Sequence, residues 1–185
     1  TGLLIVCSGK MTKQIEGYMG QEKEYTGTFV LGSTTESFDL EKPIIPVGDP
    51  SAITFNEVEK AVHQLTGNIL QIPPMHSAIK VDGKRVYASA RLGLEVKMNP
   101  RQVEVREFEI TRFENGELDF RISCSKGTYI RSLARDLGEL LGVGAYLKTL
   151  CRTRIGTYSL NDAFEVSDLV SLIQSRTNEN LPAAN

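Results

Sequence analysis

Two arginines, Arg131 and Arg135, stand four residues apart in the stretch CSKGTYIRSLARDLGELLG, which begins at Cys124. Side chains at this spacing leave a helix on one side, so both guanidinium groups are expected to point in a common direction. Residues 120 to 155 hold seven Lys or Arg against two acids, a local charge of +5 in a chain whose formal net charge is −2. This bias indicates an anionic partner, although a solvated helix face produces the same pattern.

A helix over 130–141 has to position these arginines. Its apolar residues recur at steps of three and four, which is the spacing of one buried helical face. They are Ile130, Leu133, Ala134, Leu137, Leu140 and Leu141. Gly142 follows as a C-terminal stop. The arginines are therefore predicted to lie on the side of this helix away from the core.

A second basic feature is the segment PPMHSAIKVDGKRVYASAR, which starts at Pro73. Its Asp82–Gly83 pair is typical of a two-residue hairpin turn, and Lys80, Lys84 and Arg85 flank it. A projecting basic hairpin suits contact with an RNA backbone, and an ordinary exposed hairpin is the alternative. Little in residues 73–101 would anchor this segment to a core, so we expect RNA to order it.

Other patterns supply a framework for these basic features. Alternation of side chains over 24–31 predicts a strand that carries Tyr25, and Thr54 with Glu57 predicts a capped helix. A long antiparallel hairpin is predicted with its turn at Asn115–Gly116. The remaining predicted elements are a short helix over 11–20, a last strand over about 152–160 and a short helix over 166–173.

Length and composition limit the class of protein. The 185 residues, 41% of them apolar, suffice for one domain with a real core. The chain has no apolar run of eighteen residues and no signal-peptide pattern, so no membrane association is expected. Its three cysteines share no CxxC spacing and neither histidine is near them in sequence. We therefore expect neither a disulfide framework nor a metal site, which fits a cytoplasmic protein.

The chain contains three notable blocks of sequence, in this order: KEYTGTFVLGSTTESFD from Lys23, PPMHSAIKVDGKRVYASAR from Pro73, and CSKGTYIRSLARDLGELLGVGAYLKTLCRTRIG from Cys124. Together they resemble the TruB family of tRNA pseudouridine synthases. The resemblance implies an α+β fold with a mixed, largely antiparallel central sheet flanked by helices. It also implies a catalytic domain over 1–164 with an RNA-clamping thumb at about 73–101. Residues 165–185 are then a helix and tail, with no PUA domain.

The chemistry that this resemblance implies is isomerisation of uridine to pseudouridine at position 55, in the T loop of tRNA. The glycosidic bond to N1 breaks and the base is rejoined to the sugar through C5, without a cofactor. The target uridine has to be flipped out of its stack to be reached. The expected partner is therefore the T arm of tRNA, bound by a protein that we expect to be a monomer.

The resemblance also implies roles for individual residues. Tyr25 matches the tyrosine that stacks on the flipped base and takes part in proton removal from C5, and Arg131 matches the arginine that pairs with the nucleophilic aspartate. Leu150 matches a leucine that packs against the base, with a plain core position as the alternative, and Asp39 matches an aspartate at the edge of the site. The candidate RNA contacts are Lys80, Lys84, Arg85, Lys126, Arg135 and Arg152. His76 stands where many family members have tyrosine.

The nucleophile of the family lies in the signature GTLDPxATG, and Thr1–Gly2 matches its final two letters. The expectation is therefore that the nucleophilic aspartate belongs upstream of Thr1 and that the 185-residue chain is inactive. Arg131 would then lack its carboxylate partner within this chain. The alternative function is a non-catalytic RNA-binding or tRNA-folding module, which would keep the basic surfaces and the stacking tyrosine.

Overall fold

The computed structural model of this chain describes residues 1–75, 80–81, 84–85 and 98–179. Its body is a six-stranded sheet in the order β10-β9-β1-β8-β7-β4. The strands of this sheet are β1 (Lys23–Leu31), β4 (Gly67–Gln71), β7 (Arg101–Glu114), β8 (Glu117–Cys124), β9 (Ala145–Ile155) and β10 (Tyr158–Ser159). Each of its described ladders is antiparallel, and two isolated parallel bridges add to them. The expected α+β fold with a largely antiparallel sheet is confirmed.

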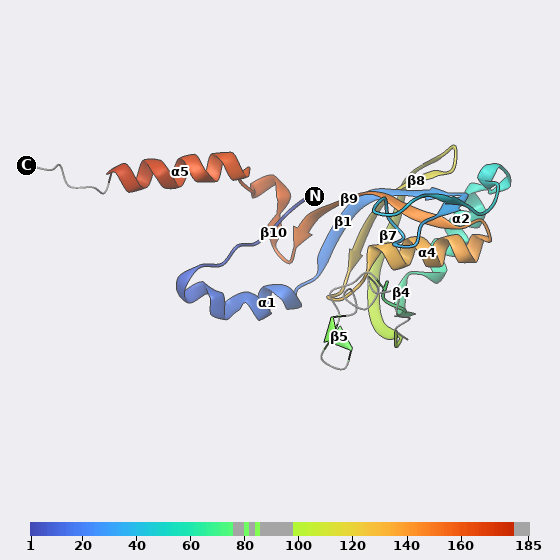
Figure 1. Cartoon of the computed structure of the whole chain (residues 1–185), viewed down its shortest axis with the longest axis horizontal. Helices are drawn as coiled ribbons and strands as arrows, with labels where there is room; N and C mark the ends of the chain where they lie inside the picture. Colours follow the sequence, from blue (N-terminus) through green and yellow to red (C-terminus); the bar gives the residue numbers. More distant parts are fainter. Residues whose placement is uncertain (76–79, 82–83, 86–97, 180–185) are drawn as a thin grey trace, which may run out of the picture.

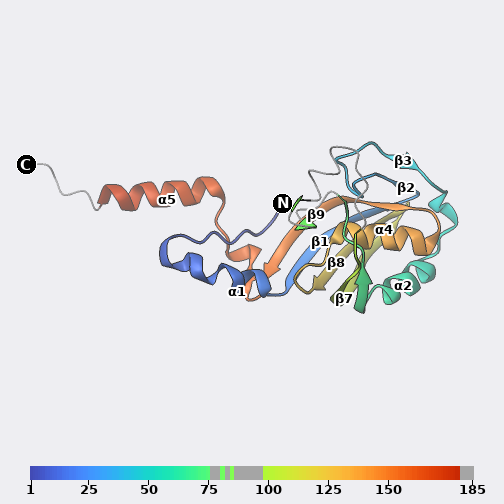
Figure 2. The same cartoon turned by 60° about the horizontal axis from the view of Figure 1, so that its bottom comes forward.

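Two helices, α2 and α4, cover one face of this sheet, whereas α1 and α5 extend away from its end near β10 (Figure 1; Figure 2). The helices are α1 (Ile15–Gly20), α2 (Phe55–Gln64), α4 (Ile130–Leu141) and α5 (Val166–Glu179), and the 3₁₀ turns are Gly9–Gln14, Pro50–Ala52 and Leu160–Asp162. Short strand pairs form between β2 (Ser33–Thr34) and β3 (Ile45–Pro46), and between β5 (Lys80–Val81) and β6 (Lys84–Arg85). None of the described helices is long and apolar enough to span a bilayer.

The core lies between this helical layer and the sheet. Side chains alternate across a strand, so Phe29 of β1 and Phe120 of β8 point toward α4. Both rings are buried, and their centroids are 4.3 Å apart. Leu133 and Leu137 of α4 are fully buried against this layer. The predicted apolar stripe of α4 is therefore confirmed, except that Leu140 at its end is 46% exposed.

Two glycines show why the predicted stops and turns occur where they do. Gly142 ends α4 with φ of 72°, and Gly116 has φ of 76° beside Asn115 at 51° in the β7–β8 turn. This left-handed region is accessible to glycine and, at small cost, to asparagine. The predicted helix end and hairpin turn are thus both confirmed. The capping box at Thr54 and Glu57 is confirmed as well, with reciprocal hydrogen bonds at the start of α2.

The last predicted strand begins too late. The structure starts β9 at Ala145 and runs it to Ile155, with β10 as a separate short strand. Two register shifts against β1 break the alternation of side chains along β9, which hides the strand from a period-two pattern. The helix predicted over 11–20 is half 3₁₀ turn, and α5 is longer than predicted.

The basic hairpin is described only in part. Lys80 pairs with Arg85, and Val81 with Lys84, in an antiparallel ladder, as predicted. The turn at 82–83, His76 and the segment 86–97 lie outside the described residues. The expectation that RNA orders 73–101 therefore stays a prediction.

Candidate active site

A cleft of about 510 Å³ opens beside β1, between α1 and the turn that leads into α4. Tyr25 lies in its wall, together with Tyr18 of α1 and Tyr129. The charged side chains among its described lining residues are all cations: Lys23, Arg101, Lys126 and Arg152. A cleft with aromatic rings and positive charge suits an anionic ligand that carries a flat ring, such as a nucleotide.

Tyr25 is half-buried near the start of β1, with Ile122 of β8 and Arg152 of β9 as its strand partners. Burial raises the pKa of the Tyr25 phenol, and nearby Cys124 adds to the rise, while Arg152 opposes it. A phenol with a raised pKa stays protonated at neutral pH. Tyr25 can therefore stack through its ring and donate a hydrogen bond, but it is not a preformed base.

Arg152 is fixed by the N-terminal residues of the chain. Its Nε donates to the carbonyl oxygen of Leu3 at 2.8 Å, and Leu3 N donates to the carbonyl of Arg152 at 2.8 Å. Gly2, which precedes Leu3, has φ of 108°, and a Cβ at this position would lie 2.4 Å from the backbone N of Arg152. Glycine at this position therefore allows the N-terminal segment to run against β9 and to hold the Arg152 side chain.

Arg131 has a carboxylate partner within this chain, so the expectation that it lacks one is wrong. Its Nη1 donates to Oδ2 of Asp39 at 2.8 Å, and the two side chains are 20% and 19% exposed. Oδ1 of Asp39 accepts from Ser37 Oγ at 2.6 Å and from Glu41 N at 3.0 Å. Asp39 lies in the loop that follows β2. This loop reaches Arg131 because it pairs with β9 at Leu147, whose backbone N donates to the carbonyl oxygen of Phe38.

Arg135 leaves α4 on the same side as Arg131 and contacts the same loop. Its guanidinium lies 5.4 Å from the centroid of the Phe38 ring. It also forms an ion pair with Asp136 at 2.6 Å, and its side chain is 15% exposed. Burial raises the pKa of Asp136, against the lowering effect of Arg135. Arg135 is thus engaged within the protein, and an RNA phosphate would have to compete with Asp136.

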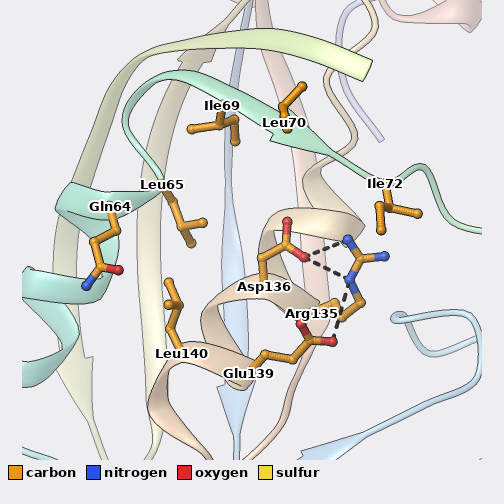
Figure 3. A pocket seen from close by; sticks show the side chains of 9 residues that line it. All are labelled: Gln64, Leu65, Ile69, Leu70, Ile72, Arg135, Asp136, Glu139 and Leu140. Atoms are coloured by element: carbon orange, nitrogen blue, oxygen red, sulfur yellow. Dashed lines mark hydrogen bonds and ion pairs between the residues drawn. The ribbon is translucent and has the colours of Figure 1, made fainter. Parts of the chain in front are cut away.

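Arg135 belongs to a different hollow from the Tyr25 cleft. This hollow of about 680 Å³ lies between α2, α4 and β4, with the Arg135–Asp136 pair and Glu139 on the α4 side, and Gln64 and apolar side chains around the rest (Figure 3). Its described lining holds one cation against two acids, Asp136 and Glu139. The balance of charge makes it a poorer site for a polyanion than the Tyr25 cleft.

Leu150 lies on β9 opposite Gly27 and packs partly against the core. Its carbonyl oxygen accepts from the amino group and from Oγ1 of Thr1. Among the described residues, Leu150 and Arg131 do not line the Tyr25 cleft. The structure therefore brings Tyr25, Lys126 and Arg152 together in one cleft. It pairs Arg131 with Asp39 and places Leu150 outside the described lining of that cleft. The predicted roles of these residues stay predictions.

Sequence reasoning missed two cations of the cleft, Lys23 and Arg101, as well as the aromatic residues Tyr18 and Tyr129. Lys23 stands two residues before Tyr25 on the same strand, so the period of two could have placed both on one face. Its Nζ also donates to the carbonyl oxygens of Met19 and Gln21 at the end of α1. Arg101 begins β7, and its place in the cleft depends on a strand order that the sequence does not display.

Two family models together match residues 1–183, and individual relatives match most of the chain. The sequence model for "TruB family pseudouridylate synthase (N terminal domain)" matches residues 1–130, and that for "tRNA pseudouridylate synthase B C-terminal domain" matches 131–183. The tRNA pseudouridine synthase B of Flavobacterium johnsoniae is 47% identical over 167 residues, covering 90% of this chain and 73% of the relative. That of Phocaeicola vulgatus is 48% identical over 166 residues, covering 90% and 71%.

A solved structure shares the fold. In the crystal structure of a Cbf5-Nop10-Gar1 complex, one chain aligns with a TM-score of 0.71 at 24% identity, covering 98% of this chain and 45% of that one. This chain thus spans less than half of that neighbour, and the likeness supports the fold alone. The boundary between the two matched family regions falls at the start of α4. Strands of both regions belong to the same sheet, since β1 of the first region pairs with β9 of the second. The chain belongs to the TruB family of tRNA pseudouridine synthases, isomerases that convert uridine to pseudouridine in tRNA.

Proposed function

We propose that this protein forms pseudouridine at position 55 of tRNA, in the T loop, and that the Tyr25 cleft receives the flipped uridine. The observation that carries the proposal is the cleft itself. Tyr25 and Tyr129 lie in its wall, and each charged side chain among its described lining residues is a cation. In the reaction the C1′–N1 bond breaks, a C1′–C5 bond forms, C5 loses its proton and N1 gains one. The cleft has to stack the base and hold the flanking phosphates through these steps.

Within this site Tyr25 stacks on the base. Because its phenol is protonated at neutral pH, it can accept the C5 proton only while passing on its own, through a hydrogen-bonded acceptor. Lys126 and Arg101 are exposed and can bind phosphate oxygens without giving up any partner described here. The cleft is thus suited to a nucleotide in a single-stranded loop.

We assign to Arg131 the orientation of the nucleophilic aspartate of the family signature GTLDPxATG. Asp39 is a poor candidate for the nucleophile, because three donors already occupy its two oxygens. Hydrogen bonds of this kind lower the reactivity of a carboxylate by stabilising its charge. Asp39 instead fixes the Arg131 guanidinium.

The proposal is tested with tRNA transcripts that carry uridine tritiated at C5. We expect the protein, as its gene encodes it, to release one equivalent of tritium per tRNA, and to release none from a transcript with cytidine at position 55. Equal release from both transcripts would assign the reaction to another position. Tight binding of tRNA without any release would favour the non-catalytic RNA-binding module.

The cleft cations give a separate prediction about RNA affinity. We expect Arg101→Gln with Lys126→Gln to weaken tRNA binding and to lower the slope of log K against log salt by about one for each lost phosphate contact. The matched control is Arg112→Gln, because Arg112 is paired with Asp119 at 2.7 Å on the sheet face away from α2 and α4. Filter binding between about 50 and 200 mM salt measures both slopes. An unchanged slope in the double variant would remove this cleft from the interface.

A further inference from the structure

Gln71, the last residue of β4, is 1% exposed and uses both ends of its amide on one residue of another element. Tyr129 N donates to its Oε1 at 2.8 Å, and its Nε2 donates to the carbonyl oxygen of Tyr129 at 3.1 Å. The two residues are 58 positions apart in the chain. The Gln71 amide therefore binds the backbone N–H and C=O of Tyr129 in the way that a neighbouring strand would.

That backbone unit is the start of α4. Tyr129 is the N-cap residue and makes no capping bond with its own side chain, so the entry to the helix depends on groups outside it. Its carbonyl oxygen also accepts from the backbone N of Ser132 and Leu133. One turn further, Ser132 Oγ donates to the carbonyl of Ile72 at 2.8 Å. The first turn of α4 is thus attached to the end of β4 on both sides of Arg131.

Two features of the site depend on this attachment. Thr128 and Tyr129 form part of the wall of the Tyr25 cleft. Arg131 follows Tyr129 by two residues and meets Asp39 at 2.8 Å. A buried amide with two short hydrogen bonds restricts both sliding and rotation of the helix entry. A small displacement here would move the cleft wall and the Arg131 guanidinium together.

We propose that Gln71 is a positioning residue for the isomerisation: its amide fixes the turn at 128–131, and so sets the place of Arg131 and of the cleft wall. This inference rests on the proposed function of Arg131. The role differs from ordinary burial of a polar group, because it predicts an effect on turnover in protein that is fully folded.

Gln71→Glu provides the sharpest test. A neutral carboxyl group has one donor and one acceptor, so it can reproduce both bonds to Tyr129. An ionised carboxylate cannot donate, and it would face the Tyr129 carbonyl oxygen with a negative charge. Burial raises the pKa of a carboxyl group, so the neutral form persists at low pH and is lost as pH rises through that raised pKa.

We expect Gln71→Glu to have nearly wild-type kcat at about pH 5.5, and to lose on the order of 100-fold relative to wild type by about pH 9. The KM for tRNA should change by less than about twofold, since the phosphate-binding cations are untouched. Gln71→Met should show a comparable loss at every pH. Folded protein is measured by circular dichroism at each pH, so that kcat refers to folded molecules.

Val62→Ala is the matched control for stability, because Val62 is buried in α2 and has no part in the β4–α4 attachment. It should lower the melting temperature and leave kcat and its pH profile unchanged. Ser132→Ala removes the hydrogen bond to Ile72 and should lower kcat severalfold by the same factor at every pH. This variant tests the attachment even if Gln71→Glu unfolds at high pH.

Parallel pH profiles of Gln71→Glu and wild type, or a Ser132→Ala variant with unchanged kcat, would overturn the positioning role. Arg131→Lys is assayed beside them. Wild-type kcat in Arg131→Lys would mean that the proposed function of Arg131 is wrong. A loss there, together with unaffected Gln71 variants, would contradict the positioning role alone.

Discussion

Arg131→Met is expected to lower pseudouridine formation by about 1,000-fold or more, because a fixed cationic donor at a reacting carboxylate is worth that order of rate. The same change should lower the free energy of unfolding by about 2 kcal/mol, less than the 3 to 5 for fully buried pairs. The discount follows from the exposure of the two side chains, about a fifth each. Without Arg131, Oδ2 of Asp39 loses its ion pair while its Oδ1 remains held.

The stability is measured by urea unfolding of the 185-residue chain, and the activity by tritium release from the protein as its gene encodes it. Arg112→Met is the control, because Arg112 also pairs with an aspartate but is 45% exposed. Exposed pairs contribute little, so its unfolding midpoint and activity should hardly change. Equal effects of both substitutions on unfolding, with full activity in each, would show that the Arg131–Asp39 pair has no special role.

Tyr25→Phe is expected to reduce turnover by at least about 100-fold, which is typical for loss of a proton-transfer group. Affinity for tRNA should stay within about twofold, because the ring that stacks is retained. Burial raises the pKa of the Tyr25 phenol, so activity that needs the protonated phenol should persist in wild type up to a pH above about 10, the ordinary value. In Tyr25→Phe the residual activity should show no such alkaline limb.

Tyr146→Phe is the matched control, since Tyr146 of β9 is a buried tyrosine and is not among the described residues that line the cleft. It loses a hydroxyl group outside the cleft and should retain full turnover. Single-turnover kinetics with saturating enzyme separates binding from chemistry for both variants. Wild-type turnover in Tyr25→Phe would leave stacking as the contribution of this residue.

The sequence predicted the elements whose signals are local. The period of α4, its glycine stop and the Asn115–Gly116 turn each lie within a few residues, and all three are confirmed. The early part of β9 was missed because its register shifts disturb the alternation. Local periodicity also could not show that the end of β4 lies beside the start of α4, since that contact joins residues 58 apart.

The candidate site was predictable in part for the same reason. Tyr25, which the family resemblance marks, lies in one cleft with Lys126 and Arg152, which belong to the basic stretch over 120–155. The pairing of Arg131 with Asp39 was not foreseen, although both residues had been named. They are 92 residues apart, and only the folding of the 33–39 loop onto β9 brings the carboxylate to α4. The sequence makes Arg135 a candidate RNA contact, whereas the structure pairs it with Asp136 beside it.

The position of β1 between β8 and β9 bears on how the chain is assembled during synthesis. Lys23 pairs with Cys124 and with Ile155, so its partners lie 101 and 132 residues later (124 − 23 and 155 − 23). At about 5 to 20 residues per second, translation takes roughly 7 to 26 seconds to span the longer interval. The β7–β8 hairpin can close within about 10 microseconds of its emergence. The nascent chain therefore presents Phe29 and Leu31 on an unpaired strand for seconds, and β1 has both of its neighbours only after β9 has been synthesised.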